Sequence, residues 1–256
     1  MYAGVKRDHN GNARDKSNAD APRNRFHDMF EGFRDELDQH HDRRERIVKV
    51  SRDVTAQSKK IIFTLQRVKK LNQDFPPNIQ KDMDTRIAEI SNLLGSVAPD
   101  LQSINRYRYQ PSMRCLEELV EALSFAHYLR HQTLITPEET QAAVPADVSL
   151  TPHDYLYGIF DLFGELMRFA TVTTAQAGEL LGDHGRTILG DMQELGCAYE
   201  MMHEIPTRDF RQKRDVMRQS VKKVEKLGYG LVVRGSERPK GWVPDMKDEG
   251  PEPQSP

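Results

Sequence analysis

The sequence predicts an all-α protein, and three observations support this prediction. Between the chain ends, Pro and Gly gather at only a few points, and the long segments between these points suit helices better than strands. Apolar residues in these segments recur at steps of three and four residues. No segment alternates apolar and polar residues over a useful length, and no internal repeat is present. We therefore expect an elongated helical bundle of about six to seven helices.

The two ends of the 256-residue chain differ in composition from the rest. Residues 1–22 are polar and nearly free of apolar side chains, and residues 239–256 are acidic and rich in Pro, so we expect two disordered tails. The helical domain is expected over residues 23–238. No apolar run is long enough to cross a membrane, and the two cysteines form neither a disulfide framework nor a zinc cluster. These features predict a soluble, intracellular protein of a reducing compartment. The expected localisation is the cytoplasm and the nucleus.

The first helix has the clearest pattern. Positions on one face recur at alternating steps of four and three residues, with a polar interruption from His40 to Ser51. The face comprises Phe26, Phe30, Phe33, Leu37, His40, Arg44, Ile47, Ser51, Val54, Ser58, Ile61, Leu65 and Val68. This heptad predicts a helix of about 45 residues and roughly 65 Å. A helix of that length leaves apolar surface for another subunit to cover.

Further helices follow in order along the chain. Two short motifs open helices with an N-cap threonine, a first-position proline and a capping-box acid: Thr136-Pro137-x-Glu139 and Thr151-Pro152-x-Asp154. The second of these motifs begins the helix that carries Asp161. The other helices are expected over residues 78–95, 100–134 with a break near Pro111, 174–204 and 207–234.

Two pairs of acidic residues lie on largely apolar helices. Glu118 and Glu121 are three residues apart, and Asp161 and Glu165 are four apart, which places the members of each pair about 60° and 40° apart on one helix face. Asp161 and Glu165 are the only acids in the apolar stretch LYGIFDLFGELMRF. A buried carboxylate is costly unless it is paired, protonated or bound to a cation. Two such pairs predict a site for a hard metal ion.

A solvated helix face is the alternative for each pair. This alternative suits Glu118 and Glu121 better, because glutamate is a good helix former. It suits Asp161 and Glu165 less well, because their helix offers little solvated face. Glu117 is expected to point elsewhere.

Basic residues are concentrated in two stretches, although the formal net charge of −2 gives no signal for nucleic acid. Residues 43–70 hold ten Lys or Arg against two acids, and residues 208–226 hold eight against three. Such stretches predict phosphate binding, with ordinary solvated faces as the alternative. Arg106-Tyr107-Arg108-Tyr109 interleaves cations with aromatic rings, a pattern suited to unpaired bases or to helix-end packing. The candidate RNA-binding residues are Arg43, Arg44, Arg106, Arg108 and Arg114.

Other motifs are weaker. His127 and His131 have the spacing of zinc ligands but lack the glutamate of the HExxH motif and a cysteine partner. Glu200-x-x-His203 is half of a di-iron carboxylate motif, which normally requires a second copy. GYGLVV near the C-terminus echoes an RNA-recognition sheet, but the chain offers no strands for one. No P-loop or dinucleotide fingerprint is present.

Four stretches of the chain resemble the translin family. They are ELDQHHDRRERIVKVSRDVTAQSKKIIFTLQRV, LEELVEALSFAHYL, DYLYGIFDLFGELMR and KKVEKLGYGLVVRGSERPK. With the helical segments between them, these stretches cover residues 26–240. The combination of VEALSF with DLxGELMR is specific, and it resembles the branch of the family that carries matching carboxylates rather than translin itself.

The resemblance implies an all-helical subunit that assembles with translin into a closed hetero-oligomeric shell. It also implies a magnesium-dependent endoribonuclease centre for single-stranded RNA, including nicked passenger strands of small interfering RNA and transfer-RNA precursor fragments. The catalytic acids of the family match Glu118, Glu121, Asp161 and Glu165. The connection from Thr136 to Thr151 is shorter and less acidic than in animal members of the family.

We therefore predict a metal-dependent endoribonuclease subunit. The four acids would hold one or two Mg²⁺, with Mn²⁺ as a substitute, and Glu121 or Glu165 would serve as general base. The expected partners are a translin subunit and single-stranded RNA, with single-stranded DNA as a second nucleic acid. The alternatives are a non-catalytic nucleic-acid-binding scaffold and a ferritin-like di-iron protein.

Overall fold

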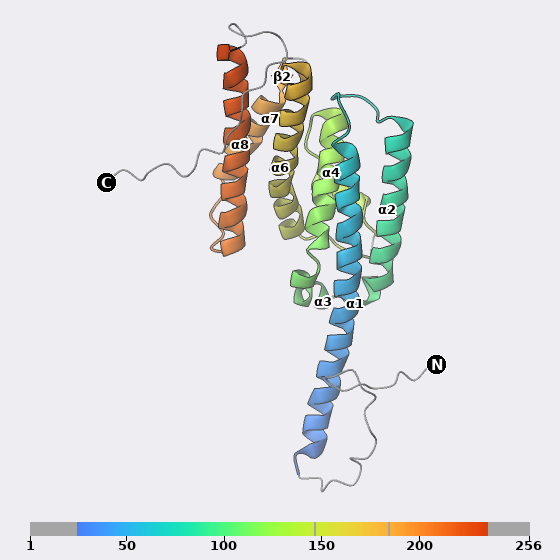
Figure 1. The fold of residues 1–256 in the computed structure, drawn as a ribbon. Coiled ribbons are helices and arrows are strands. Elements are labelled where there is room, and N and C mark those ends of the chain that lie inside the picture. The colour runs from blue at the N-terminus through green and yellow to red at the C-terminus, as the bar shows by residue number, and fades with distance from the viewer. Residues whose placement is uncertain (1–24, 146, 184, 235–256) are drawn as a thin grey trace, which may run out of the picture. The chain divides into compact units, whose positions relative to one another are not determined.

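The all-α prediction is confirmed by the computed structural model, which describes residues 25–145, 147–183 and 185–234 (Figure 1). The predicted tails, 1–22 and 239–256, lie outside these residues. The α-helices are α1 (His27–Leu65), α2 (Pro77–Val97), α3 (Asn105–Arg108), α4 (Cys115–His131), α5 (Pro137–Ala142), α6 (Pro152–Ala177), α7 (Ile188–Glu200) and α8 (Arg208–Arg234). Within the described ranges, no helix is both long and apolar enough to cross a membrane.

The first helix is slightly shorter than predicted, at 39 residues. The chain divides into two compact units between Arg43 and Arg44, inside α1. In the second unit the predicted heptad face is buried except at Arg44, and it includes two serines as well as apolar residues: Ile47, Ser51, Val54, Ser58, Ile61 and Leu65. In the first unit the heptad residues Phe30 and Phe33 are exposed, and their rings pack edge to face with 6.0 Å between centres.

Two predicted helices are wrong in extent. The segment 100–134 is broken more often than the single break near Pro111, into the 3₁₀ turns η2 (Ala98–Leu101) and η3 (Gln110–Ser112) and the helices α3 and α4. The segment 174–204 is not one helix, because α6 continues to Ala177 and ends at Gly178, whose positive φ of 75° forms a left-handed C-cap. A short antiparallel pair, β1 (Gly182–Asp183) and β2 (Arg186–Thr187), then precedes α7.

Both predicted capping boxes are present. The Thr136 hydroxyl accepts from the Glu139 amide at 3.1 Å, and Glu139 accepts from the Thr136 amide at 2.9 Å. At α6, the Asp154 carboxylate accepts from the Thr151 amide at 2.8 Å, and the Thr151 hydroxyl accepts from the Asp154 amide at 3.2 Å. Asp154 is buried and also receives a hydrogen bond from buried Arg106. This ion pair ties α3 to the start of the helix that carries Asp161.

The core is centred on α6. This helix packs against α4 on one side and α8 on the other, and α7 contacts both α6 and α8 (Figure 1). Its aromatic side chains fill the space between these helices: the Phe160 ring meets Tyr199 of α7 at 4.5 Å and Phe210 of α8 at 5.5 Å, both edge to face. The α6 backbone is therefore held from several sides, which fixes the positions of its acidic residues.

Candidate functional site

All four predicted acids line one cavity of about 660 Å³. Two come from α4 and two from α6, and α1 and α8 supply further walls. The lining residues are Lys59, Ile62, Phe63, Gln66, Glu118, Glu121, Asp161, Glu165, Arg168 and Val216. Residues distant in sequence are therefore gathered around one set of carboxylates.

The two glutamates of α4 differ in solvent exposure. Glu118 is partly exposed, and its carboxylate lies 3.4 Å from the Lys59 ammonium of α1. Glu121, one turn further along, is 8% exposed. Among the described residues no group donates a hydrogen bond to the Glu121 carboxyl or forms an ion pair with it. Glu121 is therefore a buried acid without a partner inside a group of acids.

The α6 pair is held by neighbouring side chains. The Gln66 amide, directly after α1, donates to the Glu165 carboxylate at 2.6 Å, and the Arg168 guanidinium lies 3.3 Å from the other carboxylate oxygen. Asp161 pairs with the Lys213 ammonium of α8. Each of these acids therefore has its orientation set by a residue on another helix or on the next turn.

Crowding of the acids changes the protonation of Glu121. Its pKa is raised to about 8, first by burial and then by the negative charges of Asp161, Glu118 and Glu165. Burial and like charges both disfavour the ionised form, so a cation in the cavity would favour it. The electrostatics of the cavity therefore favour a positively charged ligand.

A glycine allows the two acid-bearing helices to approach closely. A Cβ atom at Gly158 of α6 would lie 2.6 Å from the Val120 Cβ and 2.7 Å from the Glu117 carbonyl oxygen, both on α4. No side chain fits in that space. Gly158 precedes Asp161 by less than one turn, so this contact sets the distance between the two pairs of acids.

A second cavity, of about 320 Å³, adjoins the first and shares Glu118, Asp161 and Val216 with it. Lys213 lies at the junction, with its ammonium 3.4 Å from Glu117 as well as paired with Asp161. Glu117 is buried, and burial raises its pKa despite the nearby charge of Lys213. Glu117 therefore lines the second cavity and not the first, and Lys213 links it to Asp161.

The donor set fits a hard divalent cation in its chemistry. Carboxylate oxygens are the ligands that Mg²⁺ prefers. The amide oxygen of Gln66, beside Glu165, is buried and has no hydrogen-bond donor among the described residues. The side chains as placed are nevertheless turned toward Lys59, Lys213 and Gln66, and no three metal-ligating groups of the described residues lie close enough together to hold an ion. Ion binding would require these side chains to turn toward one another.

The five candidate RNA-binding arginines do not form one surface. Arg106 is 3% exposed and donates to Asp154 and to the Ser149 carbonyl, so the prediction that it contacts RNA is wrong. The side chain of Arg108 is exposed, as is that of Arg44 on α1. Arg43 is half-buried on the same helix, and Arg114 pairs with Asp209 of α8. Tyr109 is buried, so the stacking pattern of residues 106–109 is interrupted.

The side chains of the weaker motifs make contacts with other residues of the chain. Both carboxylate oxygens of Glu200 accept from the Arg218 guanidinium, at 2.6 and 2.7 Å, which leaves this half-motif engaged in an ion pair. The His127 and His131 rings pack on each other with 4.7 Å between centres, and His127 also bonds Thr133. Within the described part of the chain, neither set belongs to a metal-ligating cluster.

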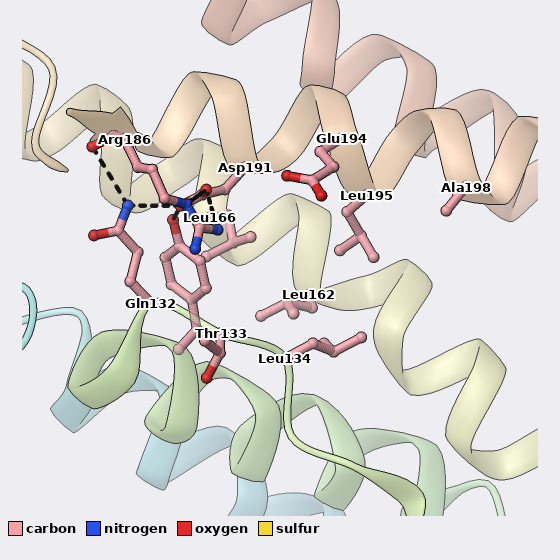
Figure 2. Close-up of a pocket in the computed structure, with 11 residues that line it drawn as sticks. Gln132, Thr133, Leu134, Leu162, Leu166, Arg186, Asp191, Glu194, Leu195 and Ala198 are labelled. Carbon is pink, nitrogen blue, oxygen red and sulfur yellow. Dashed lines mark hydrogen bonds and ion pairs between the residues drawn. The ribbon is translucent and has the colours of Figure 1, made fainter. Parts of the chain in front are cut away.

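A third cavity, of about 300 Å³, lies where α4, α6 and α7 meet β2 (Figure 2). Its polar side is centred on Asp191, which accepts from Tyr128 at 2.8 Å, from Gln132 at 2.7 Å and from the Arg186 guanidinium at 2.6 Å. Burial and the Asp191 charge raise the pKa of Tyr128, so its hydroxyl remains a donor. The other lining residues are Thr133, Leu134, Leu162, Leu166, Glu194, Leu195 and Ala198. The hydrogen bonds to Asp191 hold α7 against α4.

The chain is similar in sequence to known proteins of one family. Residues 42–235 match the Translin family, and the chain belongs to this family. It is 30% identical over 242 residues to Translin-associated protein X of Rattus norvegicus, covering 85% of this chain and 82% of that protein. It is 29% identical over 215 residues to the Translin-associated protein X homolog of Schizosaccharomyces pombe, covering 82% and 89%.

The fold is also similar to that in the crystal structure of apo-NeC3PO. The TM-score is 0.61 at 20% identity, over 79% of this chain and 96% of that one. At this level of identity the similarity supports the fold. The resemblance of the sequence to the translin family is thus confirmed over most of the helical domain.

Proposed function

We propose that this chain is the catalytic subunit of a divalent-metal-dependent endoribonuclease that cleaves single-stranded RNA. One observation carries the proposal: four carboxylates from two helices line one cavity, and among the described residues no group pairs with the carboxyl of the buried Glu121. A hydrolytic metal centre uses such a set, whereas a scaffold that only binds RNA has no need of buried acids. The fragments expected as substrates are nicked passenger strands of small interfering RNA and transfer-RNA precursors.

The roles of the acids follow from their positions. Glu118, Glu121, Asp161 and Glu165 would hold Mg²⁺, or Mn²⁺ in its place. The bound metal would polarise the scissile phosphate and lower the pKa of a bound water. Gln66 orients Glu165 through its 2.6 Å hydrogen bond, and Lys213 orients Asp161.

The cations of the cavity would balance the phosphate charge. Lys59 and Arg168 have largely exposed side chains, 63% and 64%, and both line the cavity. Each of these two side chains is already within ion-pair distance of a carboxylate. Each can therefore rotate from that carboxylate to a phosphate that enters the same cavity. They would hold an RNA backbone across the carboxylates.

We propose that the working form is a hetero-oligomer with a translin-type subunit. Similarity to Translin-associated protein X supports this partner by the name those relatives carry. The exposed apolar residues Phe30, Phe33 and Leu37 of α1 support association by their chemistry.

Cleavage of a labelled single-stranded RNA by the purified chain combined with a translin-type subunit tests this function. We expect shorter fragments with Mg²⁺ or Mn²⁺, none with EDTA, and slower cleavage of an intact duplex, whose bases are stacked inside. Chromatography in the same buffers reports assembly. RNA that is bound equally well in every buffer and never cut would favour the scaffold and contradict the proposal.

A further inference from the structure

The cavity has an aromatic residue at its edge that the carboxylate chemistry does not use. Phe63 lines the same cavity as the four acids and is 73% exposed. Its neighbours Ile61, Ile62 and Leu65 are buried in the core. Burying a phenylalanine ring is worth about 1.5–3 kcal/mol, so an exposed ring beside a charged cavity leaves that free energy unused in the isolated chain.

The position of Phe63 on α1 places its side chain at the cavity that the four acids line. Lys59 precedes Phe63 by four residues on α1. Gln66 follows it by three in the turn after α1, where its backbone amide still donates to the Ile62 carbonyl, so the three side chains lie on one side. Lys59 lies 3.4 Å from Glu118, and Gln66 donates to Glu165 at 2.6 Å. The ring therefore projects between two contacts that each reach a carboxylate. Within the described residues no other aromatic ring or cation packs on it.

The exposed ring and the nearby cations are the groups that could bind the base and the phosphate of one nucleotide. An exposed ring offers a stacking surface for any base, and the adjacent Lys59 and Arg168 offer positive charge for the phosphate on either side of it. The carboxylates of α4 and α6 line the same cavity. A base can reach the ring only when it is unpaired, because bases of a duplex are stacked inside.

We propose that Phe63 stacks on the base next to the scissile phosphate and so makes the cavity selective for unpaired nucleotides. This inference rests on the proposed function and adds a specificity-determining residue to it. The aromatic segment at residues 106–109, which the sequence suggested for this task, has its second tyrosine and first arginine buried. Stacking is therefore assigned to the helix that faces the acids.

The test measures binding to a short single-stranded RNA that carries an abasic nucleotide at each position in turn. The chain is assembled with its translin-type subunit, and Ca²⁺ replaces Mg²⁺ to slow cleavage. Wild type is expected to lose affinity about 10-fold at one position, because base stacking on an aromatic side chain contributes at that level. Phe63→Leu should bind the intact strand about 10-fold more weakly and show no loss at that position, and Phe63→Tyr should restore the wild-type profile.

Two controls separate stacking from packing. Tyr229→Ala removes another exposed aromatic residue, 70% exposed on α8 and outside the cavity, and should leave the profile unchanged. Phe63→Leu keeps the apolar bulk, so its sedimentation with the partner should match wild type.

The inference is wrong if Phe63→Leu gives the same abasic profile as wild type. It is also wrong if Phe63 serves assembly alone, in which case Phe63→Ala disrupts the complex whereas Phe63→Leu retains both assembly and RNA affinity. The binding measurement decides this point whether or not the strand is cut in Mg²⁺, and cleavage in Mg²⁺ decides the proposed function.

Discussion

Glu121→Gln and Asp161→Asn are each expected to lower the rate of RNA cleavage at least about 100-fold while RNA binding and assembly stay near wild type, because metal assistance supplies several kcal/mol of transition-state stabilisation. Both substitutions keep the size of the side chain and remove one negative ligand. Glu121→Gln should also not lower the melting temperature of the metal-free protein, because it removes a buried acid that three other acids repel. Single-turnover cleavage and thermal unfolding check both parts.

Glu89→Gln is the matched control for these variants. Glu89 is exposed on α2 and lies outside the three cavities, so this variant should cleave RNA as wild type does. Wild-type cleavage by both Glu121→Gln and Asp161→Asn would remove the acids from the mechanism.

Gly158→Ala is expected to lower the free energy of unfolding by about 1–3 kcal/mol, the usual range for an overpacked contact. The added methyl would lie 2.7 Å from the Glu117 carbonyl oxygen, which is backbone and cannot rotate away. Gly164→Ala, on the same helix, should instead raise the free energy by about 0.5–1 kcal/mol, since alanine favours the helix. Apart from its chain neighbours and the backbone of its own helix, no atom of the described residues lies within 4 Å of a Cβ at Gly164.

Urea denaturation of the two glycine variants gives the comparison directly. Equal stability changes of the same sign would contradict the close approach of α4 and α6 at Gly158. A destabilised Gly158→Ala with unchanged cleavage would show that the helices can separate without disturbing the acids.

The carboxylates could be chosen from the sequence because they break an apolar pattern. Asp161 and Glu165 interrupt an otherwise apolar helix, and such interruptions are visible in one dimension. The capping boxes before residues 137 and 152 were predictable for a similar reason, because their hydrogen bonds span only three residues. Local spacing is sufficient wherever both partners of an interaction lie within one turn.

The surroundings of the acids could not be predicted in this way. Lys213 is separated from Asp161 by 52 residues, and in the sequence it is one cation among several in a basic stretch. Gly158 marks a close contact only once the identity of the opposing helix is known. Arg106 resembled a nucleic-acid contact until its buried pairing with Asp154 became visible. Each of these roles depends on tertiary packing.

Titration with Mn²⁺, followed by the electron paramagnetic resonance signal of the free ion, tests most directly whether the cavity between α4 and α6 binds a divalent cation. The assembled complex is expected to remove Mn²⁺ from solution and to release it when Mg²⁺ is added, because both ions favour oxygen ligands. The double variant Asp161→Asn/Glu165→Gln should lose this binding and keep its assembly. Equal Mn²⁺ binding by wild type and double variant, or no binding by wild type, would contradict the assignment of these carboxylates as a metal site.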